Sequence, residues 1–297
     1  MDKTAFTKMS GCGNDFIIID NRLGNLEEDI LPIFSRRVCE RRVSMGADGV
    51  LVLENSLHAD FKMRLFNRDG SEGEMCGNGA RCIARYAFVE NIAPRKMVFE
   101  TLAGNIYAEV GEVLVKIKMG DIKINGFNED RKVNTCKGEL ICNYIIAGVP
   151  HCVIFIKDLD GIADDELRGL GREIRFNKEE FPEGTNVNFV QELGESRVKV
   201  ITYERGVEDL TLACGTGSTA SALTACIKKG HISPVEVVTR GGLLRVYFNK
   251  TSGMFTDIYL EGEARFIAQG YILKEAWDYD GEEVVKFAHG KEFKNIV

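Results

Sequence analysis

Two short segments of the chain place a cysteine directly before a Gly-x-Gly turn. Residues 76–79 read Cys-Gly-Asn-Gly, and residues 214–217 read Cys-Gly-Thr-Gly. An alanine-containing stretch that predicts a helix follows each turn, so each cysteine is expected at a helix N-terminus. The first backbone N–H groups of a helix lack intrahelical partners and attract negative charge, which favours a thiolate there. The segments therefore predict two reactive thiols, each beside amides that can bind an anion.

The two segments belong to an internal repeat. An offset of 138 residues takes Cys76 to Cys214, and seven of the 29 positions from 76 to 104 are identical in both copies, where chance gives roughly two. Two matching halves can aim two thiols at one carbon from opposite sides. A thiolate would remove the α-hydrogen of an amino acid, the opposite thiol would return a proton, and the helix N-termini would hold the carboxylate. This scheme requires no cofactor, so none is expected.

The elements that must position these thiols follow from apolar runs bounded by Gly, Asn and Asp. Such runs predict strands at residues 16–19, 49–53, 61–66, 110–119, 144–146, 153–155, 198–203 and 246–248. Helical patterns cover residues 30–42, 78–91, 163–174 and 216–229. Because strands outnumber helices and do not alternate with them as in βαβ units, the sequence predicts an α+β fold. We expect two pseudo-symmetric domains, each an antiparallel sheet wrapped around a central helix.

The domain boundaries are expected near the ends of two matching hairpins. The first domain should comprise residues 1–118 together with 268–297, and the second should comprise residues 119–267. The apolar run at 271–273 is expected to return to the first domain. The sequence assigns no role to the tail from 275 to 297.

Composition limits the classes of function. The chain has 297 residues, of which 44% are hydrophobic and 28% charged, as in soluble globular proteins with two cores. The net charge is −7 and no Lys/Arg-rich run occurs, which argues against nucleic acid and anionic membranes as partners. With neither a signal-peptide pattern nor an 18-residue apolar window, we expect a cytoplasmic protein.

Cysteine usage points away from disulfides and metals. The nine cysteines are odd in number and irregularly spaced, there is no Cys-x-x-Cys pair, and the four histidines do not cluster with them. Neither a disulfide framework nor a zinc site is expected. A dinucleotide site is also disfavoured, because neither Gly-x-Gly has the third glycine of that fingerprint.

Taken together, these residues resemble the diaminopimelate epimerase family. The matching stretches are residues 13–16, 66–71, 75–82, 148–152, 181–189, 203–206 and 211–220. The resemblance implies a cofactor-independent isomerase of lysine and peptidoglycan biosynthesis that interconverts LL- and meso-diaminopimelate. It implies that Cys76 and Cys214 are the acid–base pair, with Glu204 and His151 beside the reacting centre. It implies substrate contacts from Asn14, Asn67, Gly77, Asn78, Asn186, Arg205, Gly215 and Thr216, and Arg205 can pair bidentately with a distal carboxylate.

Two departures from the family pattern keep alternatives open. Val149 stands where the family commonly has Asn, and Gly49 stands where some members have Gln. One alternative is a cofactor-independent racemase of another amino acid, for which Val149 is the positive sign. The other is a non-catalytic thiol-redox or carboxylate-binding protein. The expected partner is a small amino-acid substrate, with a homodimer left open.

Overall fold

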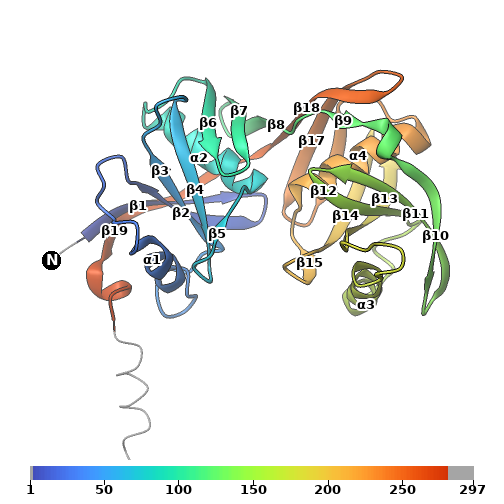
Figure 1. The fold of residues 1–297 in the computed structure, drawn as a ribbon, viewed down its shortest axis with the longest axis horizontal. Coiled ribbons are helices and arrows are strands. Elements are labelled where there is room, and N and C mark those ends of the chain that lie inside the picture. The colour runs from blue at the N-terminus through green and yellow to red at the C-terminus, as the bar shows by residue number, and fades with distance from the viewer. Residues whose placement is uncertain (1–2, 280–297) are drawn as a thin grey trace, which may run out of the picture.

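The computed structural model describes residues 3–279, which form two lobes lying side by side (Figure 1). The elements of the first lobe are β1 (Lys3–Gly11), β2 (Asn14–Asp20), α1 (Leu31–Val38), β3 (Gly49–Glu54), β4 (Phe61–Asn67), β5 (Glu72–Gly73), α2 (Gly77–Val89), β6 (Lys96–Thr101), β7 (Gly104–Val110), β8 (Leu114–Lys118), β19 (Arg265–Leu273) and the 3₁₀ turn η2 (Lys274–Ala276). The tail from residue 280, including His289, lies outside the described residues.

The second lobe is built from the middle of the chain. Its elements are β9 (Ile122–Lys123), η1 (Ile124–Gly126), β10 (Asn128–Thr135), β11 (Gly138–Ala147), β12 (Val149–Phe155), α3 (Asp164–Arg175), β13 (Asn186–Gly194), β14 (Arg197–Glu204), β15 (Asp209–Thr211), α4 (Gly215–Lys229), β16 (Val235–Thr239), β17 (Gly242–Lys250) and β18 (Met254–Glu263). All strands of both lobes are connected through hydrogen bonds, and β18 joins the lobes by pairing with β8.

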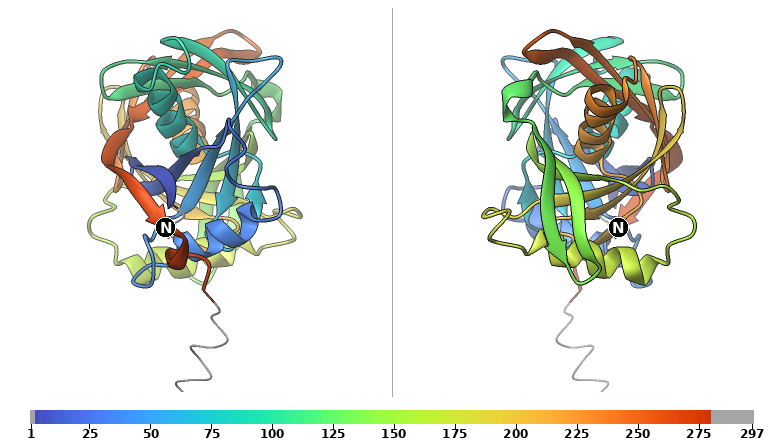
Figure 2. Two further views of the ribbon diagram at one scale, coloured as in Figure 1. Left: turned by 90° about the vertical axis from the view of Figure 1, so that its left-hand side faces the viewer. Right: turned by 90° about the vertical axis from the view of Figure 1, so that its right-hand side faces the viewer.

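The second lobe repeats the order of the first. The run β2-α1-β3-β4-β5-α2-β6-β7-β8 recurs as β12-α3-β13-β14-β15-α4-β16-β17-β18. Helices α2 and α4 are mostly buried, and seen from either end a central helix lies within a ring of strands (Figure 2). The repeat extends to single hydrogen bonds, since Thr101 Oγ1 donates to the Gly104 carbonyl and Thr239 Oγ1 to the Gly242 carbonyl, both at 2.7 Å. The predicted pair of lobes around central helices is confirmed.

The strand arrangement differs from the prediction in two ways. Four pairs are parallel, namely β2–β3, β4–β6, β12–β13 and β14–β16, and each is bridged by one of the four α-helices. The expectation that helices and strands do not form βαβ units is therefore wrong at these four places. In addition, residues 110–119 are not one strand, because the backbone N–H of Gly111 donates to the Leu114 carbonyl at 2.7 Å and closes a turn.

The termini of the described chain meet in the first lobe. Strand β19 pairs antiparallel with β1, with Ala5 opposite Tyr271, and β1 also pairs with β2. Neither β1 nor the pairing of β1 with β19 could be derived from local sequence, because β1 mixes polar and apolar residues without a long apolar run.

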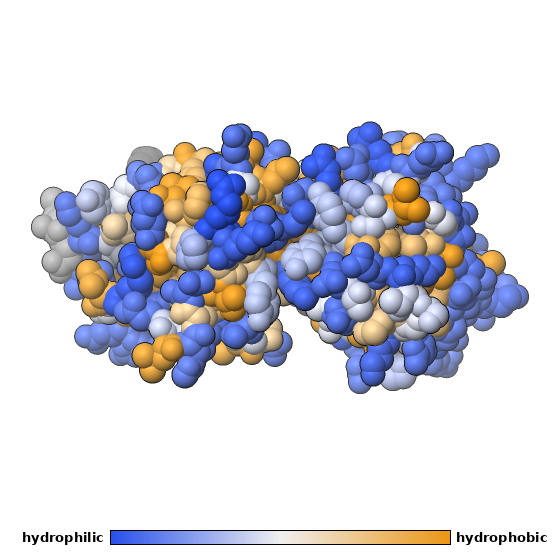
Figure 3. Space-filling view, turned by 90° about the horizontal axis from the view of Figure 1, so that it is seen from above, coloured by the Kyte–Doolittle hydropathy of each residue, from blue (hydrophilic) through white to orange (hydrophobic). Residues whose placement is uncertain are grey.

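The apolar core is continuous between the lobes. One cluster of buried residues includes side chains from both α2 and α4, and from β8 and β18 where the lobes join. Two smaller clusters lie beneath α1 and α3, on the outer side of each lobe. Viewed from above, the surface narrows between the lobes and is mostly hydrophilic on this face (Figure 3). No helix within residues 3–279 has the length and hydropathy to cross a membrane.

Candidate active site

The two predicted cysteines are the N-caps of the two central helices. Cys76 precedes α2 with φ −134° and ψ 122°, and Cys214 precedes α4 with φ −113° and ψ 118°. Each carbonyl accepts the first helical hydrogen bond at 2.8 Å, from Ala80 and Ser218 respectively. The same extended conformation at both caps gives each thiol the same relation to the free amides of its helix.

The N-termini of α2 and α4 converge on one pair of side chains. Ile117 of β8 and Leu260 of β18 are direct partners in the strand pairing that joins the lobes. A Cβ built on Gly77 would lie 3.5 Å from Ile117 Cδ1 and 3.9 Å from Leu260 Cδ2, and a Cβ on Gly215 would lie 3.0 Å from the same Leu260 Cδ2. The first residues of the two helices therefore share one leucine methyl group as a neighbour.

Cys76 is half-buried, and backbone amides and charged side chains act on its thiol. Burial raises its pKa, and the backbone amides of Gly79 and Asn78 oppose this by favouring the thiolate. A negative charge on Glu204 would raise the pKa further, whereas the charge of Arg81 lowers it. Glu204 belongs to the second lobe, and a Cβ on Gly77 of the first lobe would lie 3.9 Å from Leu260 Cδ2 of the second, so the site is built from both lobes.

The Cys214 thiol is more deeply enclosed, with 7% of the residue exposed. The Gly217 amide donates to Sγ at 3.4 Å, and Thr216 Oγ1 lies 3.5 Å from it. Burial and the charge of Glu204 raise the pKa of Cys214 to about 12, although Thr216 and the Gly217 amide oppose the shift, and a charge on Cys76 adds to it. The mutual effect means that one thiolate disfavours the other, so the pair holds one negative charge more readily than two.

A hydrogen-bonded chain in the first lobe ties together several predicted site residues. Arg81, fully buried on α2, donates to Asn78 Oδ1 at 2.6 Å, which directs Asn78 Nδ2 to Asn14 Oδ1 at 2.6 Å. Asn14 Nδ2 in turn donates to Asp48 Oδ2 at 2.9 Å. Asn78 Nδ2 also lies 3.5 Å from the carbonyl oxygen of Ala213, the residue before the second cysteine. Asn14 and Asn78 therefore lie together at the junction of the lobes.

In the second lobe, Asn186 and Arg205 are adjacent at the ends of β13 and β14. Asn186 is buried, its Nδ2 donates to the Pro150 carbonyl at 3.2 Å, and its Oδ1 accepts from the Arg205 backbone N–H at 2.8 Å. The Arg205 guanidinium donates to the Glu183 carbonyl at 3.0 Å. The positive charge of Arg205 faces no carboxylate partner among the ion pairs of the described chain, which leaves it able to pair with an anion.

Glu204 and His151 complete this side of the site. Burial raises the pKa of Glu204, which is opposed by hydrogen bonds to Thr211 and to the Cys214 thiol. His151 is fully buried, and burial lowers its pKa to about 3, with the charge of Arg205 acting in the same direction. His151 is therefore a neutral imidazole at any physiological pH.

Asn67 is the predicted residue that the structure connects least to the others. It is exposed at the end of β4, opposite Gly49, and its Nδ2 donates to Ser71 Oγ at 3.0 Å. Among residues 3–279, no hydrogen bond joins it to the thiols or to the other predicted contacts.

Several residues of the site were not predicted from sequence. Ile117 and Leu260 lie beside the first residues of the two helices, and Arg81 orients Asn78. Asn188 lies at hydrogen-bond distance from His151, and Thr202 donates to Asn188. Arg81 alone had a local signal, because it falls on the apolar face of a short helix where a charge is unusual.

A large cleft elsewhere contains none of the predicted site residues. It has a volume of about 1030 Å³ and is bounded by β1, β19, the end of α2 and η2. Within the described residues, no group of three or more His, Cys, Asp or Glu side chains is arranged to hold a metal ion.

Comparison with known proteins agrees with this geometry. The family model for diaminopimelate epimerase matches residues 6–125 and 143–267. The diaminopimelate epimerase of Aquifex aeolicus is 40% identical over 285 residues, covering 92% of this chain and 99% of that protein. The diaminopimelate epimerase of Methanocella arvoryzae is 42% identical over 284 residues, covering 92% and 98%.

Solved structures share the fold at low sequence identity. A PhzF-family phenazine biosynthesis protein of Bacillus anthracis superimposes with a TM-score of 0.71 at 15% identity, covering 92% of this chain and all of that one. A probable proline racemase of Agrobacterium radiobacter has a TM-score of 0.63 at 14% identity, covering 92% and 98%. These likenesses establish a shared two-domain fold, and the full-length sequence matches establish more: the chain belongs to the diaminopimelate epimerase family.

Proposed function

We propose that this protein is a diaminopimelate epimerase that interconverts the LL- and meso-isomers of 2,6-diaminopimelate by proton transfer between two thiols. It is an isomerase, and its reaction belongs to lysine biosynthesis and supplies peptidoglycan precursors. The observation that supports the mechanism is the convergence of two cysteine-capped helices, through Gly77 and Gly215, on one methyl group of Leu260.

The proton balance of the reaction follows from one thiolate and one thiol. The thiolate removes the α-hydrogen and becomes a thiol, while the electron pair of the broken C–H bond delocalises into the substrate carboxylate. Backbone amides at Gly77, Asn78, Gly215 and Thr216 would hold that developing charge at the two helix N-termini. The opposite thiol then protonates the other face of the carbon and becomes the thiolate. The enzyme thus ends with the proton exchanged between its sulfurs and is ready for the reverse direction.

The distal half of the substrate would be recognised by polar groups around the thiols. Arg205 supplies a planar cation for the second carboxylate, and Asn14, Asn67 and Asn186 supply amides for the second amino acid centre. Val149 stands where the family resemblance implies an amide side chain, so substrate specificity requires a direct test. Turnover of LL-diaminopimelate should exceed that of lysine, histidine and glutamate, and the reverse order would favour the racemase alternative.

Hydrogen exchange in deuterated water tests the catalytic pair. Cys76→Ala and Cys214→Ala should each slow α-deuteration of LL-diaminopimelate by roughly a hundred- to ten-thousand-fold. Cys82→Ala is the matched control, because the repeat places Ala220 at the equivalent position of α4. Wild-type exchange in both thiol variants would rule out the two-thiol mechanism and favour a non-catalytic thiol protein.

Three further expectations belong to the same proposal. The domains are residues 1–118 with 268–297, and 119–267; limited proteolysis with mass mapping tests these boundaries. The enzyme is cytoplasmic, in keeping with nine cysteines and no disulfide framework, and cell fractionation tests this. A homodimer is the proposed oligomeric state, which light scattering of the purified protein tests.

A further inference from the structure

A cluster of buried polar side chains lies beneath the N-terminus of α4. His151 of β12, Asn188 of β13 and Thr202 of β14 are 0%, 0% and 3% exposed. A Cβ built on Gly217 would overlap Asn188 Oδ1 and lie 3.1 Å from Thr202 Oγ1. Since the Gly217 amide donates to Cys214 Sγ, this cluster directly supports the turn that holds the second thiol.

The first lobe places three apolar residues at the equivalent positions. Strand register aligns Phe16, Leu51 and Leu65 with the polar cluster, because β2, β3 and β4 pair as β12, β13 and β14 do. A Cβ on Gly79 would meet Leu51 Cδ2 at 3.1 Å and Phe16 Cζ at 3.5 Å, so these side chains lie beneath α2. The fold therefore needs only apolar side chains at these positions. Burying polar groups costs free energy, so the polar residues at the equivalent positions of the second lobe indicate a specific role.

The hydrogen bonds of the cluster determine the proton positions on His151. Asn188 Nδ2 lies 3.2 Å from the carbonyl oxygen of Cys152, which can only accept, so the Asn188 amide is oriented with its nitrogen there. Asn188 Oδ1 accepts from Thr202 Oγ1 at 2.9 Å, in agreement with that orientation. The same Nδ2 lies 3.1 Å from His151 Nδ1. Because an amide nitrogen donates and does not accept, His151 Nδ1 must be unprotonated, and the proton resides on Nε2.

We propose that Asn188 and Thr202 are positioning residues that hold His151 in its neutral Nε2–H form, so that His151 donates a hydrogen bond at the reacting centre and does not act as a general base. His151 Nε2 is buried and has no hydrogen-bond partner among the described residues. It is the donor that this cluster leaves for an anion, either the substrate carboxylate or a thiolate. The inference rests on the proposed two-thiol reaction and assigns a role within it.

A doubly protonated His151 is incompatible with this arrangement. A proton on Nδ1 would face the N–H of Asn188 at hydrogen-bond distance, and the Arg205 charge further disfavours an imidazolium. A neutral donor keeps its proton while negative charge develops on the substrate, whereas an imidazolium could lose a proton to a thiolate and quench the base. His151 then only donates a hydrogen bond, and the two thiols alone transfer protons.

Nitrogen-15 NMR of histidine-labelled enzyme tests the proposal without substrate. His151→Phe, which copies Phe16 of the first lobe, assigns the His151 signals. We expect an acceptor-type Nδ1 and a protonated Nε2, both unchanged from pH 5 to pH 9. In Asn188→Leu, which copies Leu51, the signals should shift towards a mixture of tautomers. Titration of wild-type His151 within this range, or a protonated Nδ1, would overturn the proposal.

Steady-state kinetics supply the second readout. Asn188→Leu should lower kcat roughly ten- to a hundred-fold with little change in KM, and Thr202→Val should have a smaller effect in the same direction. Thr224→Val is the control, because Thr224 of α4 is equally buried and its hydroxyl has no hydrogen-bond partner among the described residues. An unchanged kcat in Asn188→Leu would refute the positioning role. If wild-type enzyme has the predicted tautomer but does not turn over diaminopimelate, the proposed function fails and the tautomer assignment stands.

Discussion

Ile117 and Leu260 are partners across the strand pair that joins the lobes, and they are also equivalent residues of the internal repeat. Ala108 of β7 and Val246 of β17 are related by the same 138-residue offset as the two cysteines, and their strand partners are Ile117 and Leu260 respectively. A pseudo-twofold axis therefore passes between Ile117 and Leu260. Any group placed on this axis sees the two helix N-termini from equivalent directions, which is the requirement for approaching one carbon from both faces.

Truncation of Leu260 should separate stability from catalysis. Leu260→Ala is expected to cost about 2–5 kcal/mol of unfolding free energy, and to lower kcat because both helix N-termini lose a shared contact. Leu244→Ala removes an equally buried leucine of β17 and is the control. Urea unfolding and kcat, measured on both variants, should show similar destabilisation but a larger catalytic loss for Leu260→Ala. Equal catalytic losses would contradict the role of Leu260 as a contact shared by the N-termini of α2 and α4.

The second glycine of each turn should respond differently to alanine. Gly217→Ala would place a methyl group against the hydrogen-bonded Asn188 amide, whereas Gly79→Ala meets the end of the Leu51 side chain, which can move. We expect Gly217→Ala to destabilise by about 1–3 kcal/mol, as overpacking does, and to reduce kcat, with a smaller effect for Gly79→Ala. Thermal unfolding and turnover of the two variants, side by side, check this ranking. Equal effects, or a larger effect for Gly79→Ala, would contradict the different surroundings of the two turns.

The central features of the site were predictable because their signals are local. Cys76 and Cys214 lie directly before Gly-x-Gly turns, and such turns indicate a helix start from the neighbouring residues alone. The polar cluster was not predictable, because Asn188 and Thr202 lie in strands where alternate polar residues usually face solvent. Only the pairing of β13 with β12 and β14 places them inside, and pairing depends on contacts distant in sequence. For the same reason the four parallel strand pairs were missed, although all four helices that bridge them were predicted.

Arg81 should control the acidity of the first thiol. Its buried guanidinium lowers the pKa of Cys76, so Arg81→Met is expected to raise that pKa and slow alkylation of Cys76 at neutral pH. Arg85→Met is the control on the same helix, since Arg85 donates to the Ala264 carbonyl outside the site. Iodoacetamide labelling across pH, followed by peptide mass mapping, measures the effect. The prediction fails if both variants shift the Cys76 profile equally.

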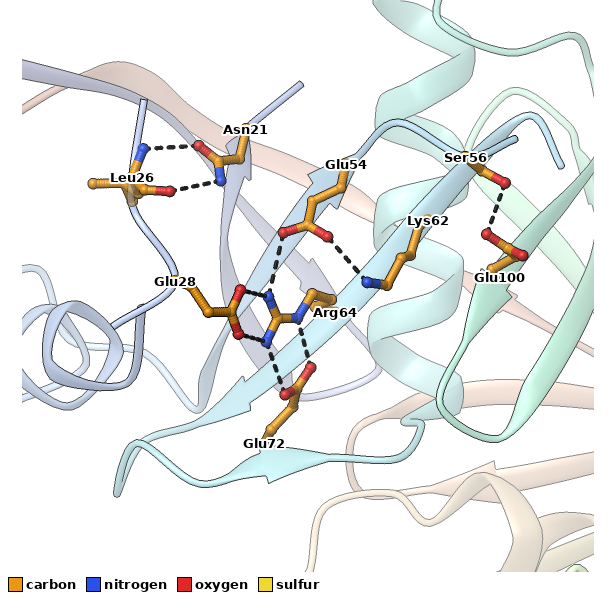
Figure 4. A network of polar contacts seen from close by, with 9 residues as sticks. All are labelled: Asn21, Leu26, Glu28, Glu54, Ser56, Lys62, Arg64, Glu72 and Glu100. Carbon is orange, nitrogen blue, oxygen red and sulfur yellow. Dashed lines mark hydrogen bonds and ion pairs between the residues drawn. The ribbon is translucent and has the colours of Figure 1, made fainter. Parts of the chain in front are cut away.

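An ion-pair network in the first lobe should contribute strongly to stability (Figure 4). Arg64 is 7% exposed and pairs with Glu72 at 2.7 Å, with Glu28 at 2.5 Å and with Glu54 at 3.4 Å. These pairs connect β4 to β5, to the loop before α1 and to β3. Arg64→Met leaves these carboxylates without their common cation and is expected to cost about 3–5 kcal/mol. Glu28→Gln, at an exposed partner, should cost less than about 1 kcal/mol. Urea unfolding compares them, and equal costs would refute the network.

Acid should destabilise the protein through His151. Burial lowers the folded-state pKa of His151 to about 3, whereas an unfolded histidine titrates near 6.5. Below pH 6.5 the unfolded chain takes up a proton that the folded chain refuses, so unfolding becomes easier by up to about 1.4 kcal/mol per pH unit until pH falls to about 3. His151→Phe removes this term, and its unfolding free energy should fall by about 2 kcal/mol less than that of the wild type between pH 8 and pH 5. Glu204, whose raised pKa acts in the opposite direction near its own titration range, is present in both proteins and cancels in the comparison. Urea unfolding of both proteins at each pH measures the difference, and an equal dependence in His151→Phe and the wild type would contradict the buried imidazole as its source.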